Sequence, residues 1–536
     1  MNIDKSLKQE DERLFKQRLQ RVHAITGIIF SLFMYIALFF GIFAILLPFI
    51  QNWEKPSRHY KMPDITKIDY NSLIEPILED PNYPKINPIT ITLPGNMQDP
   101  SLKISTDFVE PLTINPNTNE IFIDDEKISN LAMFLNHMHY GKPLGEFGLY
   151  IFGFMAVGVL FLVIGGVLLI LKIKYKNNSN TKVGLFSKYH RKIFIWTFAP
   201  FIIITLTGAM FNLGLKNSGF MTHIVSKGEA SHHAQIAYPY LFPKPTMSTL
   251  NNEKTKMLPI SELIIKAREI APEVDYQKIK IINYGDSSAL FILEGYNPYM
   301  PFLNGISNKP HVVLSGVDGK LIYQEKVLDR HWSAIFLDMI LFLHFLFGVD
   351  IFTRLVIVIL MLFSTFALGF GVLLYLEKNS RKFPKEIPIY QGFGKLSLAV
   401  MIGVIPATGL LFVLQWLLPF DMENRVLIQK GLFATLWIAT LTYSFYKLNS
   451  YKTAKEFLYL GGILFLLSPI IHFINSGFSP INLYLNEMYT ILSVDIGLFI
   501  FGLILLFVAY KLPTTKEKIQ EFWIKRGVKW KSILIN

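Results

Sequence analysis

The sequence has no cysteine among its 536 residues. This absence excludes disulfide bonds, thiolate metal sites, and iron–sulfur clusters or haem groups held by cysteine. Charged residues are also scarce, at 17% against 51% hydrophobic residues, which is below the share usual in soluble domains. Histidine, methionine and carboxylates therefore remain as the candidate metal ligands of this chain.

The apolar residues gather in eight runs, each long enough to cross a bilayer. The sequence therefore predicts an all-α polytopic membrane protein with eight transmembrane helices. The first run follows a charged segment and lacks a small-x-small cleavage site, so we interpret it as a membrane anchor. The runs lie at roughly 25–49, 149–171, 193–215, 355–376, 396–418, 427–446, 456–473 and 488–510.

Basic residues mark one side of the predicted membrane. They gather in the first 22 residues, between the second and third runs and in the C-terminal tail, whereas the loop 474–487 has none. By the positive-inside rule, both termini are expected in the cytoplasm. Topology and contact with anionic membrane lipid explain the net charge of +12, and no nucleic-acid partner is expected.

Two long segments, 51–138 and 216–333, fall on the outer face in this topology. In the second, apolar residues at helical spacing run to Pro272, and an Asp-Gly pair at 318–319 predicts a hairpin between strands 311–315 and 321–324. Two further strands are expected at 279–283 and 289–294, and the first segment shows a turn at 115–119 leading into a strand at 121–124. Each segment is therefore predicted to form a small α+β domain.

The remaining chain divides around these two segments. Residues 378–536 have short loops and one histidine, so we interpret them as an accessory block of four spans with a basic tail. The predicted units are 1–50 (N-terminus and first span), 51–138, 139–215 (second and third spans), 216–333, 334–377 (fourth span with a preceding histidine segment) and 378–536.

An internal repeat pairs four histidines. An offset of 205 residues places His139 on His344 and the Gly-Val-Leu-Leu sequence at 166–169 on the same sequence at 371–374. An offset of 167 places His23 on His190 and Gly41 on Gly208. The first and third spans begin on the cytoplasmic side and the second and fourth on the outer side, so each pair can approach one metal from opposite faces. The pattern predicts two metal or haem sites stacked through the membrane.

Each of these residues has a plainer interpretation. A single histidine near a membrane surface is usually interfacial, and the glycines alone indicate helix packing. His137 is an alternative ligand to His139, but the repeat favours His139 because position 342 is phenylalanine. The other polar candidates are possible propionate partners (Arg21, Arg191 and Arg354), an ambiguous carboxylate (Asp350), solvated loop histidines (His223, His232 and His233) and interfacial histidines (His331 and His472).

Four motifs together resemble the PepSY-associated transmembrane proteins of the bacterial inner membrane. They are a basic segment before His23, the sequence Leu-Asn-His-Met-His-Tyr-Gly at 135–141, Tyr-His-Arg at 189–191, and Leu-His-Phe-Leu-Phe-Gly at 343–348 followed by Arg354. Residues 257–326 resemble a PepSY domain. The resemblance covers about 70% of the chain, and some members of the family are siderophore-linked ferric reductases.

The resemblance implies electron transfer through two b-type haems. His23 and His190 would hold the cytoplasmic-side haem, and His139 and His344 the outer one. The expected activity is reduction of ferric iron or a ferric siderophore at the outer face, with a membrane quinol or a cytoplasmic reductase as electron donor. The four C-terminal spans depart from the family pattern, and no flavin or nicotinamide domain is fused to the chain.

Two alternatives stay open. The chain can be an iron or siderophore transporter, although its last four spans show few of the ionisable groups that ion-coupled carriers use. It can also be a non-enzymatic regulator whose PepSY-like domains bind an envelope protein.

Overall fold

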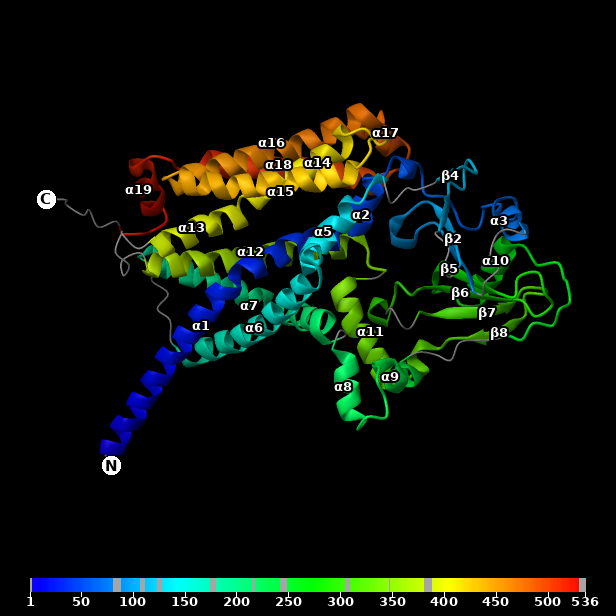
Figure 1. The fold of residues 1–536 in the computed structure, drawn as a ribbon, viewed down its shortest axis with the longest axis horizontal. Helices are drawn as coiled ribbons and strands as arrows, with labels where there is room; N and C mark the ends of the chain where they lie inside the picture. The colour runs from blue at the N-terminus through cyan, green and yellow to red at the C-terminus, as the bar shows by residue number, and fades with distance from the viewer. Residues whose placement is uncertain are drawn as a thin grey trace.

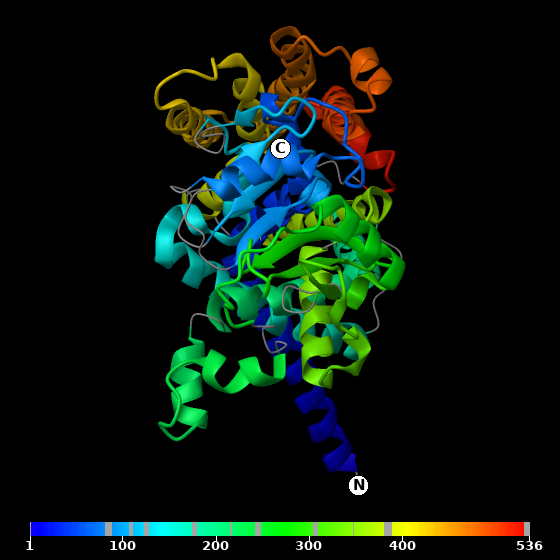
Figure 2. The ribbon, with the colours of Figure 1, turned by 90° about the vertical axis from the view of Figure 1, so that its right-hand side faces the viewer.

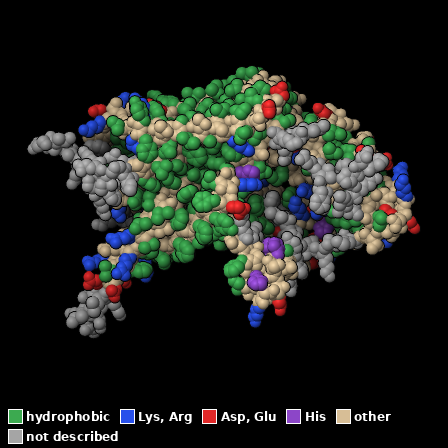
Figure 3. All heavy atoms as spheres, viewed as in Figure 1, with side chains coloured by type: hydrophobic (Ala, Val, Ile, Leu, Met, Phe, Trp, Pro, Cys, Tyr) green, Lys and Arg blue, Asp and Glu red, His purple; other side chains and the backbone are tan. Residues whose placement is uncertain are grey.

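The computed structural model describes residues 2–80, 88–106, 111–122, 128–173, 180–214, 217–241, 248–303, 309–346, 348–379 and 388–529. Long helices run beside one another, and a β-sheet lies at one end of them (Figure 1). On the face seen in Figure 3, hydrophobic side chains cover these helices, and Lys and Arg side chains lie at the end away from the sheet. This surface is the one expected of helices that face lipid.

Eight helical segments in the described ranges are long and apolar enough to span a membrane, which confirms the predicted number. They are Glu10–Ile45, Lys142–Lys172, Lys182–Gly214, Ile351–Asn379, Gly392–Leu417, Arg425–Tyr446, Ser450–Ser476 and Tyr489–Lys511. The helices that form them are α1 (Asn2–Ile45), α6 (Gly145–Lys172), α7 (Lys182–Ala209) with the π-turn η4 (Met210–Gly214), α12 (Ile351–Asn379), α13 (Pro388–Met401), α14 (Val404–Leu417), α15 (Arg425–Tyr446), α16 (Ser450–Ser476) and α18 (Tyr489–Lys511).

The spans form two groups. In the first, α1 packs on α6 and α12, and α7 packs on α6 and α12. In the second, α16 lies between α14 and α18, where Gly462 and Gly502 allow close approach: a Cβ on either would lie within about 2.8 Å of a leucine side chain on the facing helix. The second group is the predicted four-span block.

Shorter helices link the spans to the outer segments. The links nearest the membrane are α2 (Leu47–Trp53), α5 (Leu131–Tyr140), α11 (Trp332–Phe345) and α17 (Pro480–Leu485). The others are α3 (Tyr70–Glu79), α8 (Ser218–Val225), α9 (His233–Leu241), α10 (Ile260–Ile270), α19 (Lys516–Ile524) and the 3₁₀ turns η1 (Pro56–Arg58), η2 (Asn96–Gln98), η3 (Lys142–Leu144), η5 (Pro301–Leu303) and η6 (Val327–Asp329).

The two outer segments share one antiparallel sheet of eight strands, in the order β4-β3-β2-β1-β5-β6-β7-β8. The first segment supplies β1 (Ile89–Thr92), β2 (Leu102–Ser105), β3 (Leu112–Ile114) and β4 (Ile121–Phe122). The second supplies β5 (Asp275–Ile282), β6 (Leu290–Tyr296), β7 (His311–Ser315) and β8 (Leu321–Gln324). Strands of both segments lie side by side in Figure 2, where the first segment is blue and the second green.

The α+β character predicted for both segments is confirmed, but their union in one sheet was not anticipated. Strand β1 pairs with β5 in the register Ile91 to Ile279. Without this pairing each half would expose an unpaired strand edge, which is a site of unwanted association. The predicted hairpin is present, with Gly319 in the left-handed conformation at φ 68°. Residues 123 and 124 of the predicted first-segment strand lie outside the described residues.

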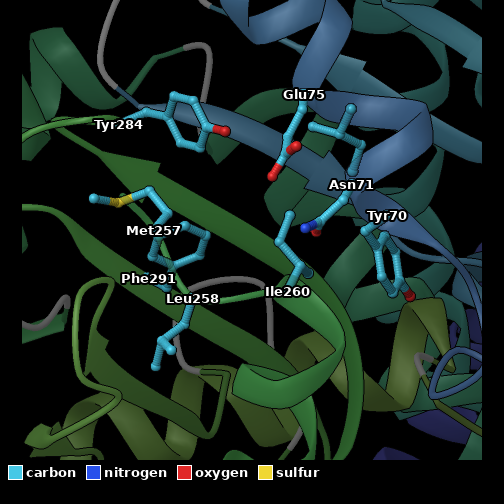
Figure 4. A pocket seen from close by; sticks show the side chains of 9 residues that line it. Tyr70, Asn71, Glu75, Met257, Leu258, Ile260, Tyr284 and Phe291 are labelled. Atoms are coloured by element: carbon cyan, nitrogen blue, oxygen red, sulfur yellow. The ribbon is translucent and has the colours of Figure 1, made fainter. Parts of the chain in front are cut away.

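Helices α3 and α10 cover one face of the sheet. They bury an apolar layer that includes Leu73, Leu263, Ile279 and Phe291. A hollow at the edge of this layer is lined by Tyr70, Glu75 and Tyr284 (Figure 4), but its volume is only about 10 Å³. That space admits about one water molecule, so the hollow is a packing defect and no ligand site.

Candidate functional site

The two histidines of the 205-residue repeat occupy equivalent places in the structure. His139 lies in the last turn of α5, which ends at Gly141 with φ 82°. His344 lies in the last turn of α11, which ends at Leu346 with φ 54°. A transmembrane helix, α6 or α12, follows each of these turns. The sequence repeat is therefore a structural repeat of short helix, left-handed turn and span.

The structure brings His139 and His344 together, with ring centroids 6.2 Å apart. Nδ1 of His139 lies 2.7 Å from the carbonyl oxygen of Ala37 on α1, and Nδ1 of His344 lies 2.7 Å from Oγ1 of Thr207 on α7. The Thr207 hydroxyl itself donates to the carbonyl oxygen of Ile203 at 2.7 Å. It must therefore accept from His344. Both rings carry their proton on Nδ1, which leaves Nε2 as the nitrogen able to bind a metal.

A cavity of about 470 Å³ adjoins this pair, between α1, α6, α7 and α12. Its size falls within the usual range of cofactor pockets, and its lining is largely apolar. The repeat glycines Gly41 and Gly208 both line it. A Cβ on Gly41 would lie 3.0 Å from Nδ1 of His139, whereas one on Gly208 would meet nothing within 4 Å. The glycines thus leave the space beside the histidines open.

The second pair, His23 on α1 and His190 on α7, meets at the other end of the bundle that α1, α6, α7 and α12 form. The ring centroids are 6.4 Å apart, and Nδ1 of His190 donates to the carbonyl oxygen of Ala367 at 2.7 Å. A Cβ on Gly371 would lie 3.1 Å from the His190 ring, and one on Gly166 would lie 3.5 Å from the His23 ring. The four glycines that the repeats aligned therefore all border the histidine sites.

The spacing of both pairs fits one metal between two imidazoles. A metal bound by two ring nitrogens at about 2.0 Å each would hold the ring centroids roughly 6.2 Å apart, because each nitrogen lies about 1.1 Å from its centroid. Among the described residues, no group of three or more His, Asp or Glu side chains is placed to hold a bare ion. Two histidines suffice for haem, because the porphyrin supplies four more nitrogens. The residues present therefore fit haem better than a bare metal ion.

The other candidate residues near the pairs have structural partners. His137 packs beside Tyr140, with ring centroids 5.8 Å apart, and is not among the residues that line the cavity. Arg354 is buried and donates to the carbonyl oxygens of Ile45 and Leu346, each at 2.7 Å. It fixes the turn that follows His344. Asp350 caps α12 by accepting from the Thr353 amide and hydroxyl.

The remaining candidate side chains are exposed or have partners in their own part of the chain. Arg21 is exposed, and Arg191 bonds to Ser187 on its own helix. His223 and His232 are exposed, and His331 caps α11 at its surface. None of these side chains lines the cavity beside His139 and His344.

The interpretation of His472 as interfacial was wrong. Its side chain is 0% exposed, and its ring nitrogens lie 2.9 Å from Oδ2 of Asp495 and 2.9 Å from Nε2 of His59. The sequence reading missed both partners. Asp495 gave a signal, since a carboxylate inside the apolar run 488–510 is rare without a role. His59 gave none, because its burial depends on how the outer segment folds onto the block.

The face of the sheet opposite α3 and α10 carries a row of polar residues that includes Lys103, Thr92, Lys278, Glu294 and His311. These residues are aligned across five strands by the strand registers. Figure 3 shows Lys and Arg side chains in a hollow between the sheet and the spans.

Lys280 and Lys309 add to the charge of this face. Lys280 pairs with Glu294. Burial and the positive charge of Lys309 lower the pKa of Lys278. The lysines therefore make this face of the sheet electropositive.

The sequence pattern of a known family matches most of this arrangement. The pattern described as the PepSY-associated TM region matches residues 20–378, which include all four paired histidines and the whole sheet. The chain belongs to this family. The match ends as α12 ends, so the four-span block lies outside it. A comparison with curated proteins finds no match.

Proposed function

We propose that this PepSY-associated membrane protein carries two b-type haems and transfers electrons from the cytoplasmic side to the outer face of the bacterial inner membrane, where it reduces ferric iron or a ferric siderophore. The observation that carries the proposal is the spacing of the two histidine pairs, 6.2 and 6.4 Å between ring centroids. Haem held by two histidines has no open iron position, which favours electron transfer over oxygen chemistry.

The residues around the pairs are suited to hold such a group without moving. Carbonyl oxygens of Ala37 and Ala367 and the hydroxyl of Thr207 orient three of the four imidazoles. Partners of this kind fix the ring tautomer and strengthen the histidine as a ligand. Because the protein holds the ligands rigidly, little reorganisation has to accompany a change of iron charge.

The outer pair lies near the electropositive face of the sheet. Turn η5, which follows β6, packs on α11, the helix that carries His344. Tyr296, at the end of β6, lies within range of the positive charge of Arg354 on α12. A negatively charged ferric chelate would be attracted to Lys103, Lys278, Lys280 and Lys309. We therefore place the acceptor between this face and the outer pair, and the electron donor, a membrane quinol or a cytoplasmic reductase, on the other side.

Spectroscopy of the purified protein in proteoliposomes tests this proposal. We expect two non-covalent haems per chain, with Soret and α bands that sharpen on reduction. After reduction, an impermeant ferric chelate on the sheet side should reoxidise both haems, and His344→Ala protein should reoxidise its remaining haem much more slowly. A colourless folded protein would overturn the proposal, and so would reoxidation only from the cytoplasmic face.

A further inference from the structure

A chain of buried polar groups crosses from the outer segment into the C-terminal block. His59, which follows η1, meets His472 on α16, and His472 meets Asp495 on α18. Both contacts are 2.9 Å, and the three side chains are 8%, 0% and 5% exposed. The indole of Trp53 donates to Oδ1 of Asp495 at 2.8 Å. His59, His472 and Asp495 therefore form a continuous hydrogen-bonded network that is buried from water.

The hydrogen bonds of this network require one proton more than two neutral imidazole rings and an ionised carboxylate carry. Nδ1 of His59 lies 2.9 Å from the carbonyl oxygen of Lys55, which only accepts, so this nitrogen carries a proton. The two Nε2 atoms face each other at 2.9 Å, which also requires a proton between them. A third proton must lie between His472 and Asp495. Two neutral rings provide only two.

The surroundings place this extra proton away from His59. Burial, and the positive charge of His472, lower the pKa of His59 to about 3, so that its ring stays neutral. The proton is therefore shared by His472 and Asp495, and the charges of imidazolium and carboxylate cancel. The ring of Trp416 lies 4.5 Å from that of His472, where its face can stabilise a cation.

The neighbouring charged groups are already engaged with other partners. Arg58 pairs with Asp99, and Lys61 pairs with Glu487 beside α18, each at 2.8 Å. Arg425 donates to the backbone carbonyls of Gln415, in the last turn of α14, and of Leu418, which follows that helix. Glu54 accepts from the Ala132 amide and interacts electrostatically with the positive charge of Lys55. Helix α14 presents Gln415 and Trp416 to this region and no charge.

We propose that His59, His472 and Asp495 form a proton-transfer site, so that the four-span block handles protons at the outer side of the membrane. In the first hop the O–H bond of Asp495 breaks as the Nδ1–H bond of His472 forms. In the second, the Nε2–H bond of His472 breaks as the Nε2–H bond of His59 forms. No electron moves, and the number of protons is unchanged until His59, the most exposed of the three side chains at 8%, releases one to water.

A buried pair of imidazolium and carboxylate is an unfavourable choice if its only role is to pack the helices together. Removing two charges from water carries a large free-energy cost, and apolar residues of similar volume often stabilise a protein equally well. Ionisable pairs inside membrane helices commonly mark proton paths. The site stands independently of the haem proposal, because none of its residues contacts the four paired histidines.

Nitrogen NMR of full-length protein in lipid, with ¹⁵N-labelled histidine, tests the extra proton. At pH 8.5 solvated histidines are neutral, so we expect a single imidazolium signal with both nitrogens protonated, or in its place the infrared band of a protonated carboxyl. His472→Gln and Asp495→Asn should each abolish the signal, whereas His331→Gln, at an exposed histidine, should leave it unchanged. Absence of both signals in folded wild-type protein would overturn the proposal.

The transfer step needs a variant that keeps the proton but cannot pass it on. In His59→Gln protein, the amide oxygen can still accept from Nε2 of His472, so the imidazolium should persist. An amide does not relay a proton, so deprotonation after a jump to high pH should slow by about tenfold or more. Unchanged kinetics would show that His59 is not the exit. Cooperative thermal unfolding of each variant verifies that it is folded.

Discussion

The first four spans and the C-terminal block use histidine in opposite ways. In the first region three of the paired rings have Nδ1 bonded to the protein, and Nε2 is left beside a cavity or a second histidine. In the block, both nitrogens of His472 are bonded to protein groups. The difference teaches that the second ring nitrogen decides the role: a histidine with one nitrogen left can bind a metal, and one with both engaged belongs to a polar network.

The two regions are nevertheless joined by a buried network. The carboxylate of Glu54 accepts from the Ala132 amide at the start of α5, the helix that carries His139. Gln415 on α14 donates to the carbonyl oxygen of Glu54 and to the Ser129 hydroxyl, at 2.6 and 2.8 Å. Arg425 donates to the carbonyl oxygen of Ile128 at 2.8 Å. The block therefore holds the start of α5 and helps to position His139.

The largest expected effect separates the two kinds of histidine. His23→Ala and His344→Ala should each halve the haem content measured as pyridine haemochrome, since each removes one ligand of one iron. His472→Gln should leave two haems.

The pairing has its own check. His190→Ala should remove the same haem as His23→Ala, and His139→Ala the same as His344→Ala, as identified by midpoint potential in a redox titration. If His23→Ala and His190→Ala remove different haems, the pairing is incorrect.

A smaller effect concerns the junction between the regions. Burial raises the pKa of Glu54 from 4.5 to about 7, an effect that the Ala132 amide and Lys55 only partly offset. The folded protein therefore favours the protonated form of Glu54. The contribution of this preference to the free energy of unfolding is fully present below about pH 4.5 and is lost as the pH rises through about 7. The shift corresponds to about 3 kcal/mol.

The unfolding temperature of wild-type protein, followed from pH 5 to pH 8, should fall more than that of Glu54→Gln, whose amide does not titrate. Glu75→Gln, on the outer helix α3, is a matched control that should keep the wild-type slope. Parallel curves for wild type and Glu54→Gln would show that Glu54 does not titrate in this range.

The smallest effect concerns the entry of the acceptor. Lys278→Gln should raise KM for a negatively charged ferric chelate by about 3- to 10-fold, with little change in kcat, because it removes one charge that attracts the chelate. Added salt should shrink the difference. Lys516→Gln, in the distant helix α19, should leave KM unchanged. An equal rise in KM for a neutral chelate would argue against an electrostatic role for Lys278.

Local sequence signals found the elements that depend on local chemistry. The eight apolar runs became eight candidate spans, and the strands 311–315 and 321–324 have the predicted bounds because an Asp-Gly turn joins them. The short strands β1, β2 and β3 were missed, since three or four residues carry little periodic pattern. The pairing of β1 with β5 joins positions about 190 residues apart, which no local pattern encodes.

The sequence by itself determined which four histidines would meet, because a repeat with fixed offsets places equivalent residues at equivalent depths at the start of spans that run in the same direction. Only the tertiary structure decided what surrounds them: the carbonyl of Ala37, the hydroxyl of Thr207 and the open space beside Gly208 come from helices distant in sequence. The same holds for His472. Its position near the end of an apolar run indicated a membrane surface, and the approach of His59 and Asp495 from two other segments buried it. Hydropathy reports how deep a residue lies, whereas its partners depend on how the helices pack.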